Sequence, residues 1–99
     1  MTAGPATSPI GGTVTWLRSA GVLSRQTAHG VLLLPPDADH PVLVDGPGAL
    51  IWELLGRPLS LETLVTALLS EYRGDRETVA DDTARVIEHL EQLGAVTRE

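Results

Sequence analysis

The sequence predicts a small α+β domain of winged-helix type, in which a three-stranded antiparallel sheet is followed by three helices. Its 99 residues, 42% of them hydrophobic, suffice for one domain with one modest core. Short apolar runs separated by turn residues fill the first half, which is typical of a meander of strands. Apolar residues at helical spacing fill the second half.

The N-terminal end differs in composition from the rest. Residues 1–12 are rich in Gly, Pro, Ser, Thr and Ala, which predicts a flexible tail before a single domain at 13–99. Val14–Leu17 has strand-forming residues but is short. We expect it to be either an extra edge strand or a strap lying on the domain.

Three short strands are predicted next, at Val22–Thr27, Val31–Leu34 and Val42–Val44. Gly30 can adopt a positive φ and suits the tight reversal between the first two. The segment Pro35–Pro41 contains three prolines and two aspartates, which indicates a loop. Such brief connections favour an antiparallel meander.

The first helix is predicted to begin after Asp45, an N-cap candidate, because Pro47 suits the first helical turn. The segment Ala49–Leu55 is mostly apolar and predicts a short, largely buried helix. Gly56 and Pro58 would end it.

Two longer helices complete the prediction, capped by Ser60 and Asp75 and ended by Gly74 and Gly94. A final extended end is expected at Ala95-Val96. The apolar positions of the second helix are Leu61, Leu64, Val65, Leu68, Leu69 and Tyr72. On the third helix the predicted apolar stripe is Val79, Thr83, Val86, Leu90 and Leu93, widened on one side by Ile87.

Composition excludes several classes of function. The chain has no cysteine, which removes disulfides, thiolate catalysis and cysteine-ligated metals. Its net charge is −6, and its seven basic residues are all arginines, whereas nucleic-acid binders are usually basic. No apolar run approaches the roughly 18 residues of a membrane-spanning helix, and no signal peptide is recognisable. The expected location is cytoplasmic, with no membrane or nucleic-acid partner.

No catalytic, metal or cofactor site is predicted. His29, His40 and His89 lie in a turn, a loop and a helix without metal-ligand spacing, so we interpret them as solvent-facing. The serines lack a nucleophile elbow, and the glycine clusters match no phosphate-binding loop.

DNA binding is the alternative that a winged helix normally suggests. The third helix would then read the DNA. Between residues 75 and 94 it carries two arginines against six carboxylates, so phosphates would repel it.

Binding of a peptide or protein is the function that these exclusions leave. If Val42–Val44 lies at a sheet edge beside the third helix, a partner peptide could add itself there as a strand. Two alternatives stay open: the Val14–Leu17 segment or a dimer mate could cover this edge.

The sequence resembles the PqqD-like family from about residue 22 to residue 96. The run Gly48-Ala49-Leu50-Ile51-Trp52-Glu53-Leu54-Leu55 after Val42-Leu43-Val44 and the spacing of Asp82, Ile87 and Leu90 carry most of the resemblance. Two features depart from the family pattern. Val44-Asp45 stands where Leu-Asn is frequent, and the loop after the second strand has Pro35-Pro36 where a glycine is usual.

The resemblance implies a recognition element for ribosomally synthesised and modified peptides, most similar to the stand-alone type of lasso-peptide pathways. Such elements bind the leader of a precursor peptide as an added strand between the third strand and the third helix. They present it to a separate, cysteine-protease-like leader peptidase, with a macrocyclase as a further candidate partner. The quinone-cofactor branch of the same family stays open. The positions implied here are Val42, Leu43, Val44, Asp82, Arg85, Val86 and His89; which flank of the helix faces the peptide, Asp82–His89 or Thr83–Ile87, also stays open.

Overall fold

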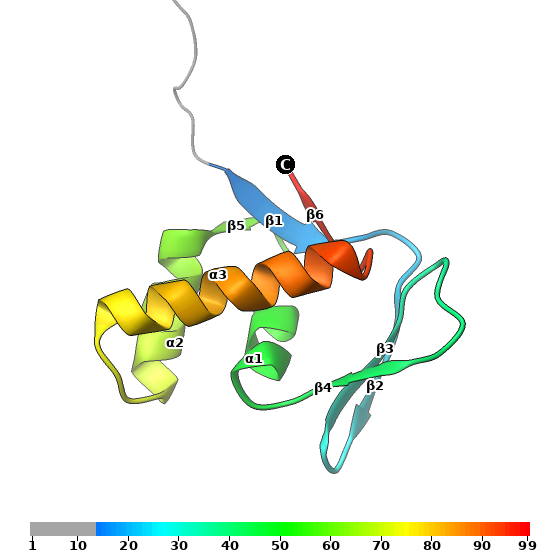
Figure 1. Ribbon diagram of the computed structural model, residues 1–99, viewed down its shortest axis with the longest axis horizontal. Helices are drawn as coiled ribbons and strands as arrows, with labels where there is room; N and C mark the ends of the chain where they lie inside the picture. Colours follow the sequence, from blue (N-terminus) through cyan, green and yellow to red (C-terminus); the bar gives the residue numbers. More distant parts are fainter. Residues whose placement is uncertain (1–13) are drawn as a thin grey trace, which may run out of the picture.

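Two small antiparallel sheets and three helices make up the fold that a computed structural model shows for residues 14–99. The predicted tail at 1–12 lies outside these described residues. Figure 1 shows the long third helix lying over the two shorter helices, with its C-terminal end close to β6. The elements are β1 (Thr15–Arg18), β2 (Leu23–Thr27), β3 (Gly30–Leu34), β4 (Val42–Val44), α1 (Gly46–Leu54), β5 (Leu59–Ser60), α2 (Leu61–Glu71), α3 (Arg76–Gln92) and β6 (Val96–Arg98).

The predicted meander is confirmed as the sheet β2–β3–β4. Leu33 of β3 pairs with Ser24 on one side and with Val42 on the other, and Val31 pairs with Val44. Val31 and Leu33 are buried, so one face of this sheet rests on the core. The opposite face carries leucines that are open to solvent, with Leu23 66% and Leu43 47% exposed.

The second sheet corrects the expectation for Val14–Leu17. This segment is neither an edge strand nor a strap, because β1 lies in the middle of the sheet β5–β1–β6. Trp16 pairs with Leu59 of β5 and with Arg98 of β6. Sequence reasoning missed β5 and foresaw β6 only as an extended end, since strands of two or three residues carry little local signal.

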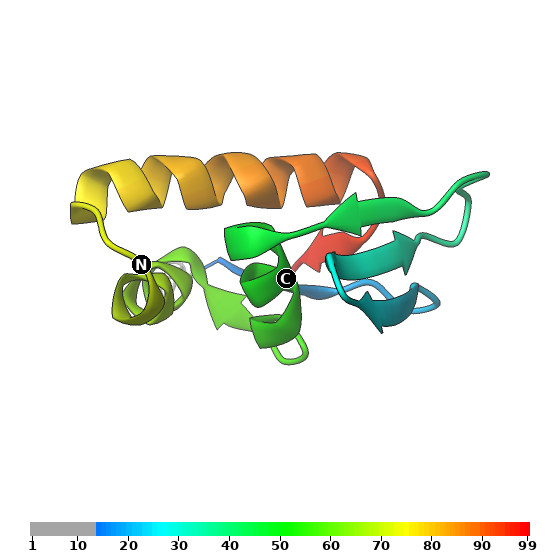
Figure 2. The same ribbon diagram turned by 90° about the horizontal axis from the view of Figure 1, so that it is seen from below.

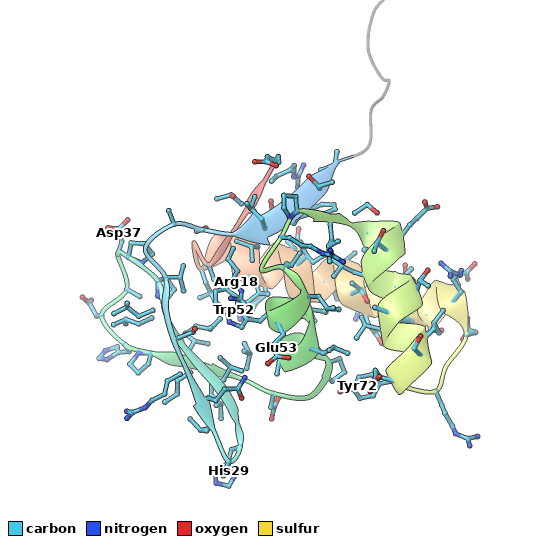
Figure 3. All side chains as sticks on the ribbon, turned by 180° about the vertical axis from the view of Figure 1, so that it is seen from behind. Arg18, His29, Asp37, Trp52, Glu53 and Tyr72 are labelled. Carbon is cyan, nitrogen blue, oxygen red and sulfur yellow. The ribbon has the colours of Figure 1, made fainter. Side chains whose placement is uncertain are left out.

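Arg18 joins this second sheet to the first helix. Its Nε donates a hydrogen bond of 2.9 Å to the carbonyl oxygen of Trp52, and its Nη2 donates one of 3.2 Å to that of Glu53. The guanidinium lies 4.6 Å from the centre of the Trp52 ring, within cation–π distance (Figure 3). A cation at the C-terminal end of α1 also suits the helix dipole.

The three helices begin where the sequence predicts them, with one difference in capping. The side chain of Ser60 accepts a hydrogen bond from the Thr63 amide at the start of α2. Asp45 occupies the N-cap position of α1, but its side chain makes no capping bond. An N-cap side chain accepts from the second or third helical amide, and Pro47 at the second position has none to donate.

The core lies where the three helices meet the inner face of β3. Its buried side chains come from β3, the three helices, β6 and the residues next to these elements: Val31, Leu33, Ile51, Trp52, Leu55, Leu64, Leu68, Ile87, Leu90, Ala95 and Val96. On α3 the buried stripe is Thr83, Ile87 and Leu90. Ile87 therefore belongs to the centre of the stripe, whereas Val86 is only half-buried.

The cap of α3 gives a pH-dependent prediction. Asp75 accepts bonds from the Thr78 hydroxyl at 2.8 Å and the Thr78 amide at 3.2 Å. These bonds, the hydroxyl first, lower the pKa of Asp75 below its ordinary value of 3.8. Because the pKa of Asp75 is lower in the folded than in the unfolded protein, its ionised side chain stabilises the fold at pH values above the unfolded-state pKa. This stabilisation is lost as the pH falls through the folded-state pKa.

We therefore expect an Asp75→Asn variant, which keeps a capping side chain, to lack this pH-dependent contribution to stability. Thermal unfolding of both proteins from neutral pH down to pH about 3 measures it. The difference in melting temperature between the two should stay constant near neutral pH and change as the pH falls below the ordinary aspartate pKa of 3.8, because the pKa of folded Asp75 is lower still. A difference that is the same at every pH would contradict the assignment.

Candidate functional site

An open groove runs between strand β4 and helix α3, with a volume of about 460 Å³. Figure 2 shows β4 lying alongside the C-terminal half of α3. The structure brings all seven sequence-predicted site residues to this groove: Val42, Leu43, Val44, Asp82, Arg85, Val86 and His89. Their role in peptide binding stays a prediction, but their assembly in one place is a property of the fold.

Four further residues line the β4–α3 groove, and sequence reasoning assigned them elsewhere. Asp45, Pro47 and Gly48 were interpreted as the start of a helix, and Leu90 as core. Asp45, Pro47 and Gly48 reach the groove because α1 begins directly after β4 and turns beneath it (Figure 2), whereas Leu90 belongs to α3 itself. The Asp-Gly-Pro-Gly sequence indicates a sharp turn from β4 into α1, and it was the local feature that could have placed these residues at the groove.

The burial pattern of α3 decides which flank of the helix faces the groove. Thr83 and Ile87 are buried, and neither lines the groove. Asp82, Arg85 and His89 are exposed, with Val86 half-buried between them. The Asp82–His89 flank is therefore the one that faces the groove.

The outer edge of β4 is unpaired among the described residues, because β4 is the last strand of its sheet. The Val14–Leu17 segment does not cover this edge, because β1 belongs to the other sheet. The carbonyl oxygen of Val44 lies so close to Gly30 that a Cβ there would collide with it, so this carbonyl points toward β3. In an antiparallel pair alternate residues point opposite ways, so the N–H and C=O of Leu43 face the free side.

Apolar side chains form the floor of the groove, and charges stand on its rim. The half-buried Val44 and Val86 supply the floor, and the core residue Leu90 lies beneath them. Arg85 and Asp82 pair at 3.6 Å, with their side chains 72% and 65% exposed. An ion pair so open to water contributes little to stability, so both groups can exchange partners when a ligand arrives.

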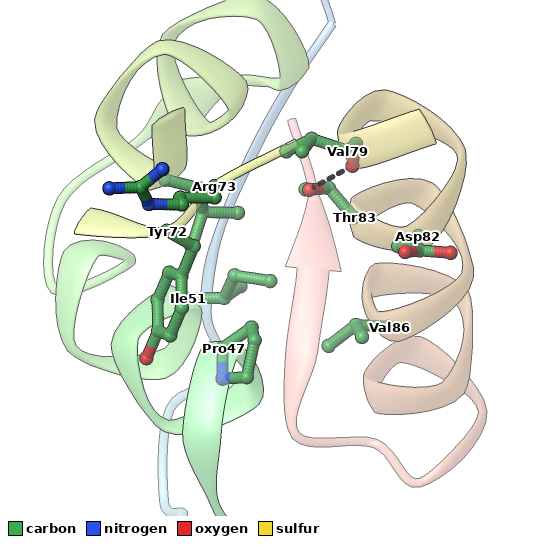
Figure 4. A pocket seen from close by; sticks show the side chains of 9 residues that line it. Pro47, Ile51, Tyr72, Arg73, Val79, Asp82, Thr83 and Val86 are labelled. Atoms are coloured by element: carbon green, nitrogen blue, oxygen red, sulfur yellow. Dashed lines mark hydrogen bonds between the residues drawn. The ribbon is translucent and has the colours of Figure 1, made fainter. Parts of the chain in front are cut away.

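A smaller apolar pocket of about 220 Å³ continues the groove beyond the end of β4. It lies where α1, the end of α2 and α3 converge, and it shares Pro47, Asp82 and Val86 with the groove. Figure 4 shows its walls. Its remaining lining residues are Ile51, Leu68, Tyr72, Arg73, Val79 and Thr83. The sequence did not predict this pocket, because it depends on how three helices pack.

No three His, Asp or Glu side chains among residues 14–99 lie close enough together to hold a metal ion. No helix of the same range is both long and apolar enough to cross a membrane.

The sequence profile described as coenzyme PQQ synthesis protein D (PqqD) matches residues 30–96, about two thirds of the chain. The chain belongs to the PqqD family. The match covers β3, β4, all three helices and the start of β6, and so includes every residue of the β4–α3 groove.

Two solved structures share the fold of this PqqD-family chain. TbiB1, solved in complex with the TbiA(beta) leader peptide, has 29% sequence identity and a TM-score of 0.72, covering 81% of this chain and 93% of its own. A lasso peptide synthetase B1, solved with the leader peptide, has 23% identity and a TM-score of 0.73, covering 83% and 96%. No curated protein is significantly similar to the chain in sequence.

Proposed function

We propose that this PqqD-family chain is a recognition element that binds the leader region of a ribosomally synthesised precursor peptide. The leader adds as a strand beside β4 and lies in the β4–α3 groove. The observation that carries the proposal is the edge of β4, which no strand within residues 14–99 pairs with and which faces an apolar groove along α3. The leader complex of TbiB1, a protein similar to this chain over most of its length, supports the same role.

The strand edge supplies backbone groups for a peptide in an alternating order. Leu43 offers its N–H and its C=O, and by the same alternation the Pro41 carbonyl and the Asp45 amide face the free side. Four such bonds at about 1 kcal/mol each, with two buried side chains at about 1.5–3 kcal/mol each, exceed the cost of ordering a peptide. A dissociation constant of roughly micromolar or below is the expected result.

The proposal includes the chain's partners. We propose that residues 13–99 form one peptide-binding domain without catalytic activity, acting in the cytoplasm. It would hand the leader to a separate leader peptidase and then to a macrocyclase. The support for these partners is the resemblance to the stand-alone proteins of lasso pathways. Whether the pathway makes a lasso peptide or a quinone cofactor would be read from the reading frames beside the gene.

A titration tests the leader assignment. The probe is the fluorescein-labelled leader of any short precursor peptide found in the reading frames beside this protein's gene, and the readout is fluorescence anisotropy. We expect saturable binding to the wild-type chain. No binding at high micromolar protein would overturn the proposal.

The variant Val86→Asp locates the binding site within the fold. Val86 is half-buried on the groove floor, and a carboxylate there would lose its hydration when the leader covers it. We expect the dissociation constant to rise at least about tenfold. The matched control is Ala84→Asp, on the same helix but away from the groove, which should bind as the wild type does once circular dichroism shows both variants folded.

The DNA-binding alternative finds no support in the surface of α3. The carboxylates of Asp81, Asp82 and Glu88 remain exposed along it. A mobility-shift assay at low salt, where phosphate attraction is strongest, should show no complex.

A further inference from the structure

Gly48 occupies a place where the fold itself does not require glycine. It is buried in the first turn of α1, and its backbone does not have a positive φ. Its neighbour Gly46 has a φ of 53°, which an ordinary residue adopts only with strain. Glycine is also a poor helix former, so Gly48 weakens α1 compared with alanine.

The surroundings of Gly48 leave room for a side chain. A Cβ added there would lie 3.8 Å from Cβ of Val44 and 3.9 Å from Cγ1 of Val86, both ordinary contact distances. These two neighbours belong to β4 and α3, the two walls of the groove, and Gly48 itself lines it. A Cβ at this position would therefore occupy the groove floor without displacing any atom of the protein.

We propose that Gly48 is a specificity-determining residue, which keeps the groove deep enough for one large aliphatic or aromatic side chain of the leader. The inference rests on the proposed function and defines the substrate class more closely. A leader residue beside Val44 in the added strand has its side chain on the same face of the sheet as Val44. That side chain points over Gly48 and reaches the backbone of α1.

The variants Gly48→Ala and Gly48→Val separate this role from a structural one, because the two effects have opposite signs. Alanine fits the backbone, so the melting temperature should rise by about 2–8 °C. The same Cβ fills the floor, so leader binding should weaken about tenfold for alanine and about a hundredfold for valine. Gly56→Ala is the matched control, since Gly56 also lacks a positive φ and lies outside the groove. It should leave leader affinity unchanged.

An alanine scan of the leader peptide completes the test. At one leader position, replacing a large side chain by alanine should weaken binding to the wild type strongly and to the Gly48→Ala variant much less. Wild-type affinity in Gly48→Ala, or a lowered melting temperature, would overturn the inference while leaving leader binding intact. If the wild-type chain binds no leader at all, the proposed function fails first, so the two failures are distinguishable.

Discussion

Replacing Leu43 by proline is expected to leave the domain folded and to weaken leader binding by about 30- to 150-fold. The amide of Leu43 faces the free side of β4, so the fold does not use it. Proline removes this donor, leaves a carbonyl group of the leader without a hydrogen-bond partner, and places its ring where the added strand would lie. Edge strands tolerate proline on their open side, and Pro41 already stands just before β4.

Two control variants separate the backbone from the side chain. Leu43→Ala keeps the amide and removes a side chain on the outer face, so its affinity should change less than about fivefold. Val42→Pro removes an amide that points into the sheet, so it should lower thermal stability. Anisotropy titration measures the leader affinity of all three variants, and thermal unfolding measures their stability. If Leu43→Pro binds the leader as well as Leu43→Ala does, no strand is added at β4.

Replacing Gly30 by alanine is expected to have the largest effect on stability, about 3 kcal/mol or more. Gly30 has a φ of 142°, which L-residues rarely adopt. A Cβ there would also meet the Val44 carbonyl oxygen and the Cα and Cβ of Asp45, which are the end of β4 and the start of α1. Relief of these contacts requires β4 to move away from β3, which disrupts both the sheet and the groove.

The control for Gly30→Ala is Gly94→Ala. Gly94 also has a positive φ, 78°, but a Cβ there would meet nothing within 4 Å. Its substitution should therefore cost only the backbone strain, about 1–2 kcal/mol. Urea unfolding measures both variants. Equal losses would mean that the approach of β4 to Gly30 contributes nothing to stability.

Much of the local structure could be predicted because its determinants lie close together in the chain. Ser60 and Asp75 cap their helices as expected, since a capping side chain contacts an amide only three residues away. The meander followed from short apolar runs and a glycine at the reversal. The seven site residues came from a resemblance to a known family, and the structure brings them to one groove.

The second sheet could not be predicted in the same way. Its central strand pairs Trp16 with Arg98, from opposite ends of the chain. Strands this short have no recognisable period, and their stability comes from partners that only the folded chain supplies. For the same reason the sequence predicted an edge strand or a strap at Val14–Leu17 and not the centre of a sheet.

The sequence alone determined where the helices start, which strands follow one another in the meander, and that the chain is acidic and without cysteine. These properties depend on neighbours within a few residues, or on composition. Only the tertiary structure decided that β4 has a free edge, that Asp82 and His89 rather than Thr83 and Ile87 face the groove, and that Gly48 lies on its floor. Those properties depend on how α3 packs against α1, α2 and β6 and beside β4. Burial against such distant segments is decided by the whole chain at once.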